Sequence, residues 1–422
     1  MPPTPPPPPP PADLQEQQQE LLDSATHPLP RFILYAQTHH KPGPEPQEPV
    51  SLLPLLTHCT GVTHVIIAAI HLNDGPGNIT LNDHRPDHSR FDTLWAEVRQ
   101  LQDAGVKVMG MLGGAAKGSY WRLQGSAEEF EAYYTPLRDL VRHHHLDGLD
   151  LDVEEAIELP TILRLLTRLR ADFGPSFITT LAPVSTALIP DMQLPPFEYV
   201  PLDPSTGAPT AGAPPLTIPR SLPHLSGFNH FALEAGHGGL VSWYNTQFYN
   251  GWGDASNPAL WEAIAAAGWA PRKLVLGVLT NQGNGGSGYV ATGVLEAVVR
   301  ELRAKYPPPA AATPQGVGSG ANRTFAGVMG WEYFNAGGTD GFRPWEWAKR
   351  IGRAVRSSTV EPWGAQSGSG LAGAGAGAEP PVPWPEQVKQ LMELGFARPN
   401  AVAALNATDG NVEMAAGLLF EQ

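Results

Sequence analysis

The chain has 422 residues, and 42% of them are hydrophobic, which is enough for one large domain with appendages. Its formal net charge of −14 at pH 7 argues against a surface that binds nucleic acid or anionic membranes. The single cysteine, Cys59, excludes an intramolecular disulfide. The amino terminus lacks a basic region followed by an apolar run, and no apolar run is long enough for a membrane span. We therefore expect a soluble cytoplasmic protein, with unconventional secretion left open.

The first segment, residues 1–27, is polyproline followed by a Gln/Glu-rich piece. Polyproline favours an extended helix without internal hydrogen bonds, so a packed core is not expected here. We interpret the segment as a disordered tail, with a ligand for an SH3- or WW-type domain as the alternative.

Residues 28–358 alternate short β-type runs with amphipathic helical stretches. The helical stretches include residues 91–104, 127–143 and 159–171. The β-type runs are residues 32–36, 65–70, 106–112, 148–153, 177–182, 240–249, 274–279 and 326–333. Eight alternating units predict an α/β fold, a (β/α)8 TIM barrel, with residues 195–225 as a surface insertion. A doubly wound sheet would need a Gly-rich phosphate turn after the first strand, and none is present there.

Two further segments follow the predicted barrel. Residues 359–381 are rich in Gly, Ala and Ser and are typical of a flexible linker. Residues 382–422 show three short helical patterns, which predict a small three-helix domain with a marginal core.

The stretch from Leu146 to Glu154 carries the clearest chemical signal. Asp150, Asp152 and Glu154 alternate with aliphatic residues, so in a strand the three acids share one face. Burying such a row costs free energy unless the acids are paired, protonated or used in chemistry. A catalytic site is therefore the favoured interpretation, and a Ca²⁺ site is the alternative.

The pattern Asp-Gly-x-Asp-x-Asp-x-Glu, from Asp147 to Glu154, resembles the signature of family-18 glycoside hydrolases, the chitinases and their relatives. Residues 247–250 and 327–331 look like the sixth and eighth strands of the plant and fungal class III chitinases. Residues 107–114 resemble their third strand, with Met111 where the family usually has serine. The hydrogen bonds of that serine must then be supplied by other residues or be lost.

Cleaving a glycosidic bond needs an acid for the leaving oxygen and a group that stabilises the anomeric carbon. Glu154, at the open end of the strand, is the candidate acid. In the substrate-assisted mechanism of this family, the N-acetyl oxygen of the sugar attacks. The resemblance then implies that Asp152 holds the acetamide N–H, that Tyr249 donates to its oxygen, and that Asp150 shares a proton with Asp152.

Five residues are predicted to bind substrate, and no cofactor or metal is expected. Trp331 would form the apolar floor under the reacting sugar, because sugar C–H faces pack on aromatic rings. The other four are Gln247, Asn250, Tyr35 and Asp147.

The C-terminal pattern resembles a ubiquitin-associated (UBA) domain, with Leu394-Gly395-Phe396 in place of its Met-Gly-Phe loop. The resemblance implies that Met392, Gly395, Phe396 and Leu419 face the apolar patch of ubiquitin. A small bundle that binds nothing is the alternative.

The resemblance as a whole predicts a chitinase that cleaves β-1,4-linked N-acetylglucosamine polymers with retention and also binds ubiquitin. An endo-β-N-acetylglucosaminidase acting on N-glycans is the closest alternative, because it would use the same catalytic residues. A non-catalytic chitin-binding lectin on the same barrel is another, and an adaptor that acts through its C-terminal domain is the last. Chain-length preference, endo or exo action and oligomeric state stay open.

Overall fold

The computed structural model describes residues 29–44, 46–204, 206–308, 323–338, 343–356 and 385–394, and single positions at 401, 405, 411, 412, 415 and 416. The predicted tail, residues 1–27, and the predicted linker, residues 359–381, lie outside the described residues.

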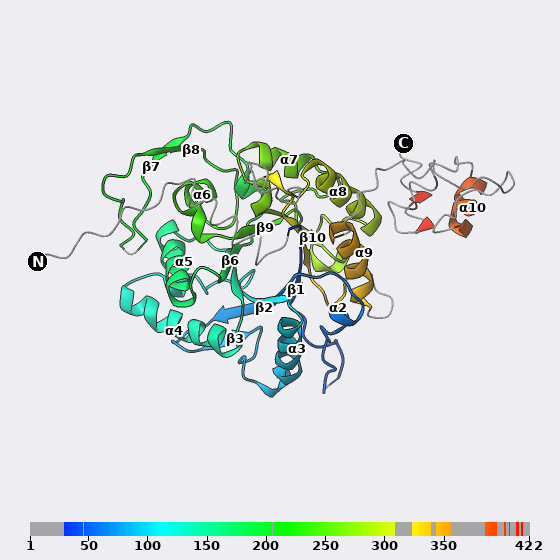
Figure 1. Ribbon diagram of the computed structural model, residues 1–422, viewed down its shortest axis with the longest axis horizontal. Helices are drawn as coiled ribbons and strands as arrows, with labels where there is room; N and C mark the ends of the chain where they lie inside the picture. Colours follow the sequence, from blue (N-terminus) through cyan, green and yellow to red (C-terminus); the bar gives the residue numbers. More distant parts are fainter. Residues whose placement is uncertain are drawn as a thin grey trace, which may run out of the picture.

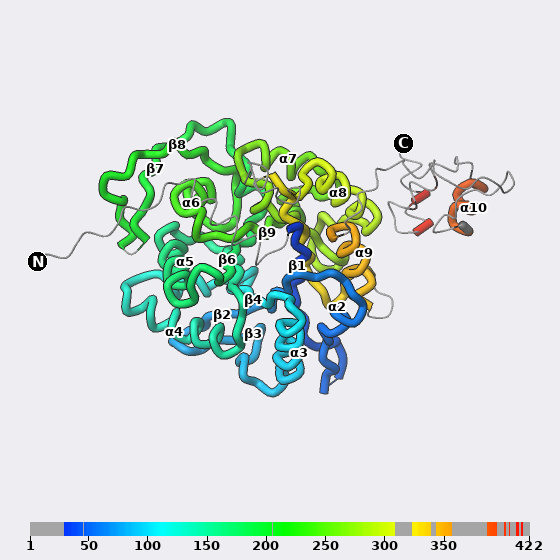
Figure 2. Tube along the Cα trace, in the orientation of Figure 1, coloured from blue at the N-terminus to red at the C-terminus, as the bar shows by residue number. Residues whose placement is uncertain are grey.

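Eight parallel strands form a closed barrel at the centre of the fold (Figure 1). Each predicted β-type run overlaps one of them, with bounds that agree within three residues. The strands are β1 (Arg31–Ala36), β2 (His64–Leu72), β4 (Lys107–Gly113), β5 (Gly148–Asp152), β6 (Ile178–Leu181), β9 (Trp243–Gln247), β10 (Leu274–Leu279) and β11 (Gly327–Trp331). The barrel closes because β1 pairs with both β11 and β2, so the first and last strands of the barrel lie side by side (Figure 2). The predicted (β/α)8 fold is confirmed.

Helices surround the strands and cover their outer faces (Figure 1). They are α2 (Pro54–Thr57), α3 (Asp92–Asp103), α4 (Ala127–His143), α5 (Leu159–Phe173), α6 (His230–His237), α7 (Ala259–Ala266), α8 (Thr292–Lys305) and α9 (Pro344–Arg356). Short 3₁₀ turns are η1 (Ser89–Phe91), η2 (Trp121–Leu123), η3 (Ser185–Leu188), η4 (Gly238–Leu240), η5 (Pro271–Lys273) and η6 (Gln282–Asn284). Within the described ranges, no helix is both long and apolar enough to cross a membrane.

The two faces of β5 meet different surroundings. Leu149 and Leu151 are fully buried in the apolar layer between strands and helices. Asp150 and Asp152 alternate with them and point into the barrel, as the alternation predicts. The barrel interior beside them is lined by a separate apolar cluster that includes Tyr35 and Trp243. The sequence pattern of β5 therefore places its acids on the inside.

The predicted insertion lies between β6 and β9 and contains a small hairpin. Its strands, β7 (Phe197–Tyr199) and β8 (Leu216–Ile218), pair antiparallel. The carbonyl oxygen of Ser226, directly after the insertion, accepts the N–H of Ile157 over 3.0 Å. The insertion thereby leads into a contact with the loop that follows β5. An unpredicted strand, β3 (Ile79–Leu81), pairs antiparallel with β2.

The C-terminal segment has its own small core. Its first helix, α10 (Pro385–Glu393), contributes Val388 and Leu391. These side chains pack with Ala401, Leu405 and Ala415, all buried.

Candidate active site

A row of carboxylates runs along β5 and beyond its carboxyl end. Asp150 is fully buried, Asp152 is 7% exposed at the last position of the strand, and Glu154 lies half-buried two residues later. Gly148 begins this strand, where a Cβ atom would lie 2.4 Å from the carbonyl oxygen of Ile178 on β6. The glycine therefore permits the close approach of the two strands. The row ends at the face where barrels of this kind carry active sites.

Three donors from three other strands surround the carboxylate of Asp150. The Tyr35 hydroxyl donates to Oδ2 over 2.6 Å. The Thr180 hydroxyl and the Asn245 amide donate to Oδ1 over 2.5 Å and 3.0 Å. Burial raises the pKa of Asp150, and these hydrogen bonds oppose the rise. They supply the polar contacts that Met111, paired with Asp150 across the sheet, cannot provide.

The charges of Asp152 and Glu154 influence each other at the mouth of the barrel. Burial, followed by the negative charges of Glu154 and Asp150, raises the pKa of Asp152 well above its ordinary value. The Gln247 amide donates to Asp152 Oδ1 over 3.1 Å. Within the described barrel, Asp150 accepts from three side chains and Asp152 from one. Ionisation is therefore better supported at Asp150 than at Asp152.

The environment of Glu154 suits a proton donor. Burial raises the pKa of its carboxyl group, while the Gln247 amide and the Lys117 ammonium oppose the rise. A carboxyl group with a raised pKa keeps its proton closer to neutral pH, as general acid catalysis requires.

Two aromatic residues flank the carboxylates. Tyr249 follows β9 and is 5% exposed. Burial, with the charges of Asp152 and Glu154, raises the pKa of its hydroxyl well above the ordinary value, so the hydroxyl remains a donor. Trp331, the half-buried last residue of β11, packs against Tyr35 with ring centroids 5.4 Å apart. Its remaining exposed surface offers an apolar face beside the carboxylates.

Glu332 ties the end of β11 to the loop after β1. Its carboxylate accepts the backbone N–H groups of Gln37 and Thr38 over 2.9 Å and 2.8 Å. It also accepts the Thr38 hydroxyl over 2.7 Å. Because Glu332 directly follows Trp331, these bonds restrain the position of the indole ring.

The structure corrects the predicted role of Asp147. This residue precedes β5 at the amino end of the barrel, five strand residues away from the mouth. Its carboxylate pairs with Lys107 over 2.9 Å and accepts the backbone N–H of Val108 over 2.9 Å. The prediction that Asp147 binds substrate is wrong, because it occupies the opposite end of the strand and links β5 to β4.

Three other predicted substrate contacts are engaged by the protein itself. Tyr35 is 1% exposed and directs its hydroxyl to Asp150. Gln247 is 6% exposed and directs its amide to Asp152. Asn250 is exposed, yet its side-chain oxygen accepts the N–H of Gly286 over 2.8 Å. Tyr35 and Gln247 therefore orient the carboxylates, and Asn250 joins the loops after β9 and β10.

Sequence reasoning missed the contribution of Glu155. This residue is 4% exposed and accepts the N–H groups of Gly118 and Tyr120, each over 2.9 Å. A second acid next to Glu154 was the available signal, since neighbouring side chains in an extended segment point to opposite sides. Thr180 was also missed, although a threonine in a buried strand needs a polar partner.

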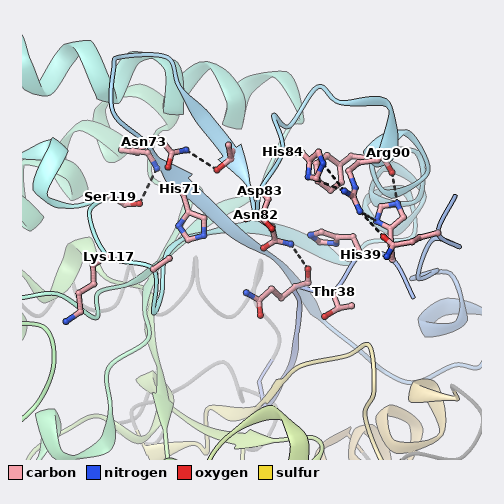
Figure 3. A pocket seen from close by; sticks show the side chains of 17 residues that line it. Thr38, His39, His71, Asn73, Asn82, Asp83, His84, Arg90, Lys117 and Ser119 are labelled. Atoms are coloured by element: carbon pink, nitrogen blue, oxygen red, sulfur yellow. Dashed lines mark hydrogen bonds between the residues drawn. The ribbon is translucent and has the colours of Figure 1, made fainter. Parts of the chain in front are cut away.

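A polar cavity of about 570 Å³ is lined by residues that follow β1, β2 and β4 (Figure 3), and one of them, Lys117, acts electrostatically on Glu154. Figure 3 shows His71 in the middle of its wall, with Lys117 on one side and Arg90 on the other. Thr38, which is bonded to Glu332, lines one end. Among the described residues that line the cavity, the one phenylalanine is Phe91, and tyrosine and tryptophan are absent. The cavity therefore offers mainly hydrogen-bonding groups.

The four predicted ubiquitin-binding residues are described only in part. Met392 on α10 is 45% exposed and accessible to a partner. Gly395, Phe396 and Leu419 lie outside the described residues, so their roles stay predictions.

Comparison with known proteins agrees with this arrangement. The model of glycosyl hydrolases family 18 matches residues 31–187, and the UBA/TS-N domain model matches residues 385–419. The structure of the chitinase ChiC from Aspergillus fumigatus is 46% identical and covers 77% of this chain and 99% of that chain, with a TM-score of 0.60. A fungal endo-β-N-acetylglucosaminidase of glycosyl hydrolase family 18 is 37% identical and covers 78% of this chain and 100% of that chain, with a TM-score of 0.63.

The closed barrel and its carboxylate row define a protein of the glycoside hydrolase class. The chain belongs to glycoside hydrolase family 18 and carries a C-terminal UBA domain. The DNA damage-inducible protein 1 of Saccharomyces cerevisiae is 50% identical over 54 residues, a match that spans 13% of this chain and 13% of that protein.

Proposed function

We propose that the barrel hydrolyses β-1,4-linked N-acetylglucosamine chains, as a chitinase does, with retention of configuration. The observation that carries this proposal is the row of Asp150, Asp152 and Glu154 at the mouth of the barrel. A two-carboxylate retaining mechanism would need an ionised nucleophile beside the acid. Asp152 is a poor nucleophile because its raised pKa favours the protonated form, and it is held by Gln247. Attack by the N-acetyl group of the substrate avoids that need.

In the first step, Glu154 gives its proton to the glycosidic oxygen while the acetamide oxygen of the substrate bonds to the anomeric carbon. The bond from that carbon to the leaving oxygen breaks, and the charge spreads over a cyclic oxazolinium ion. Asp152 accepts the acetamide N–H, and the Tyr249 hydroxyl donates to the acetamide oxygen. The negative charge on Asp150, stabilised by its three donors, offsets the positive charge.

In the second step, water attacks the anomeric carbon, the bond from that carbon to the acetamide oxygen breaks, and ionised Glu154 takes the proton released by the water. Two inversions at one carbon give net retention. Trp331 supports the sugar from below through its apolar face.

Hydrolysis is tested by mass spectrometry of the products from defined N-acetylglucosamine oligomers, with Glu154→Gln as the inactive variant. Products from the wild type and none from the variant would support the proposal. Oligomer binding without any turnover by the wild type would favour the lectin alternative.

A second candidate is an endo-β-N-acetylglucosaminidase that cuts within the N-glycan core. One observation favours it: the cavity that Lys117 shares with the loops after β1 and β2 is lined by polar groups and by a single aromatic carbocycle, Phe91, among the described residues. Aromatic rings offer the apolar contact that sugar C–H faces favour, so a cavity with one such ring fits a sugar that is bound mainly through hydrogen bonds. The 37% identical fungal relative is an endo-β-N-acetylglucosaminidase. Comparing release from chitotetraose with release from a high-mannose glycopeptide separates the two candidates.

We also propose that the UBA domain binds ubiquitin and that the protein acts in the cytoplasm. The exposed Met392 and the absence of any cysteine pair in the sequence support these proposals. Titration of ¹⁵N-labelled ubiquitin with the full chain tests the first, with Met392→Glu as the disrupting variant and Glu393→Gln as its control. Chemical-shift changes that are equal for wild type and Met392→Glu would contradict the assigned contact. Cell fractionation tests the second.

A further inference from the structure

Three glycines with positive φ values shape the end of β4 and the loop that follows it. Gly113, Gly114 and Gly118 have φ values of +93°, +93° and +116°. A Cβ atom on Gly118 would lie 2.4 Å from the Arg122 guanidinium, which donates to the Gly118 carbonyl oxygen over 2.6 Å. The path of this loop therefore depends on glycine and on contacts with neighbouring residues.

Glu155 holds this loop against the segment after β5. Its two carboxylate oxygens accept from Gly118 and Tyr120, one oxygen for each N–H group. The Ser119 hydroxyl accepts the N–H of Leu72 at the end of β2 over 3.1 Å. The loop is thus attached on both sides.

Lys117 lies in the part of the loop that the hydrogen bonds to Glu155 hold in place. It directly precedes Gly118, and Glu154 directly precedes Glu155, so the 2.9 Å bond between Gly118 and Glu155 ties the segment that carries Lys117 to the segment that carries Glu154. Lys117 is exposed and lines the cavity. Its positive charge acts on the Glu154 carboxyl group.

We propose that Glu155 and Lys117 are positioning residues of the active site: Glu155 fixes the loop after β4 so that the Lys117 ammonium is held within electrostatic reach of Glu154 and favours its ionised form. This inference rests on the proposed role of Glu154 in hydrolysis.

Several groups besides Lys117 face Glu154. Asp152 and Asp150 approach from β5, Tyr249 from the end of β9, and Tyr120 from the loop after β4. The carboxylates and Lys117 act in opposite directions, because negative charge favours protonated Glu154 and positive charge favours its ionised form. Removing the lysine therefore raises the pKa of Glu154. The basic limb of kcat/KM, where the acid loses its proton, moves to higher pH.

The test uses the full chain with Lys117→Met, Glu155→Gln and the double variant. Lys305→Met is the matched control, because it removes an equal charge at the end of α8, far from the mouth of the barrel. We expect Lys117→Met to shift the basic limb upward by about 0.3 to 0.5 pH unit, the size for an exposed charge several ångströms away. The shift should shrink at about 0.5 M salt.

Glu155→Gln keeps one acceptor oxygen and replaces the other by an NH₂ group, which releases one of the two N–H contacts. We expect the same direction of shift and a lower Tm. In the Lys117→Met background, Glu155→Gln should lower Tm again without moving the limb further. An unmoved limb in Lys117→Met would overturn the proposal, as would a shift by Glu155→Gln that persists without the lysine. If Glu155 has a structural role only, Glu155→Gln will lower Tm and leave the basic limb of kcat/KM unmoved.

The same variants are titrated by NMR with ¹³C-labelled glutamate, with Glu154→Gln to assign the Glu154 resonance. This readout follows the ionisation of Glu154 directly. If the wild type hydrolyses no substrate, the proposed function fails, while the titration still decides whether Lys117 and Glu155 control Glu154.

Discussion

Tyr35 and Asp150, which stand 115 positions apart in the sequence, share a hydrogen bond of 2.6 Å inside the barrel. The contact joins β1 to β5, two strands that are not neighbours in the sheet. Tyr35 is 1% exposed, so its hydroxyl donates to the carboxylate of Asp150 and is not accessible to a ligand. The deepest member of the acid row is therefore oriented from across the barrel.

Tyr35→Phe removes this donor and keeps the ring that packs on Trp331. The pKa of Asp150 should rise, because a hydrogen bond to the ionised form favours that form. We expect kcat to fall about tenfold, corresponding to the loss of about 1.5 kcal/mol from a charged hydrogen bond. The acid limb of the pH profile should move to higher pH. Tyr133→Phe, on the outer helix α4, is the control, and an unchanged profile for Tyr35→Phe would contradict the role assigned here.

Glu154→Gln should lower kcat on N-acetylglucosamine oligomers by about a thousandfold, because glutamine has no proton to give to the leaving oxygen. Oligomer affinity should change little, since the side chains are nearly equal in size. Glu158→Gln, four residues later and exposed, is the matched control. Turnover that survives in Glu154→Gln would refute the assignment of the acid.

Asp152→Asn should raise stability while it lowers activity. The pKa of Asp152 in the folded chain lies above its unfolded value, so the native state binds the proton more tightly. Its stabilising effect is then present at low pH and is lost as pH rises above the unfolded value toward the folded one. Asparagine does not ionise, so we expect a gain of about 1 kcal/mol near neutral pH that disappears near about pH 4. Thermal unfolding at both pH values checks this, and a lower Tm at neutral pH would contradict it.

Asp147→Asn tests the correction made by the structure. The variant weakens the contact with Lys107 and should cost about 1 kcal/mol of stability, because the pair is partly exposed. It should leave kcat and KM on oligomers unchanged, since Asp147 lies at the far end of β5. A rise in KM without loss of Tm would restore its predicted role in binding.

Much of the fold could be predicted because local patterns and topology agree. Alternating strands and helices leave few arrangements, and the row Asp150, Asp152 and Glu154 is visible because a strand has a period of two. Boundaries were less accurate at β9, where residues 238–240 form a 3₁₀ turn. The antiparallel strand β3 was missed, since three residues carry little pattern.

The hydrogen-bond partners of the acids could be assigned only from the tertiary structure. Tyr35, Thr180, Asn245 and Gln247 each lie on a different segment from the acids that they contact. The motif made Asp147 look like part of the site, although strand length places it at the other end. Glu155 was missed because its two partners lie on a loop more than 30 positions earlier.

The sequence by itself determined the barrel and the inward face of β5 and made Glu154 the candidate acid, because these depend on periodicity and on the order of residues in one strand. The tertiary structure decided which donors meet each carboxylate and which residue types line the neighbouring cavity. The reason is physical: protonation depends on burial and on nearby charges and donors, and at this site the barrel brings those groups together from separate strands and loops.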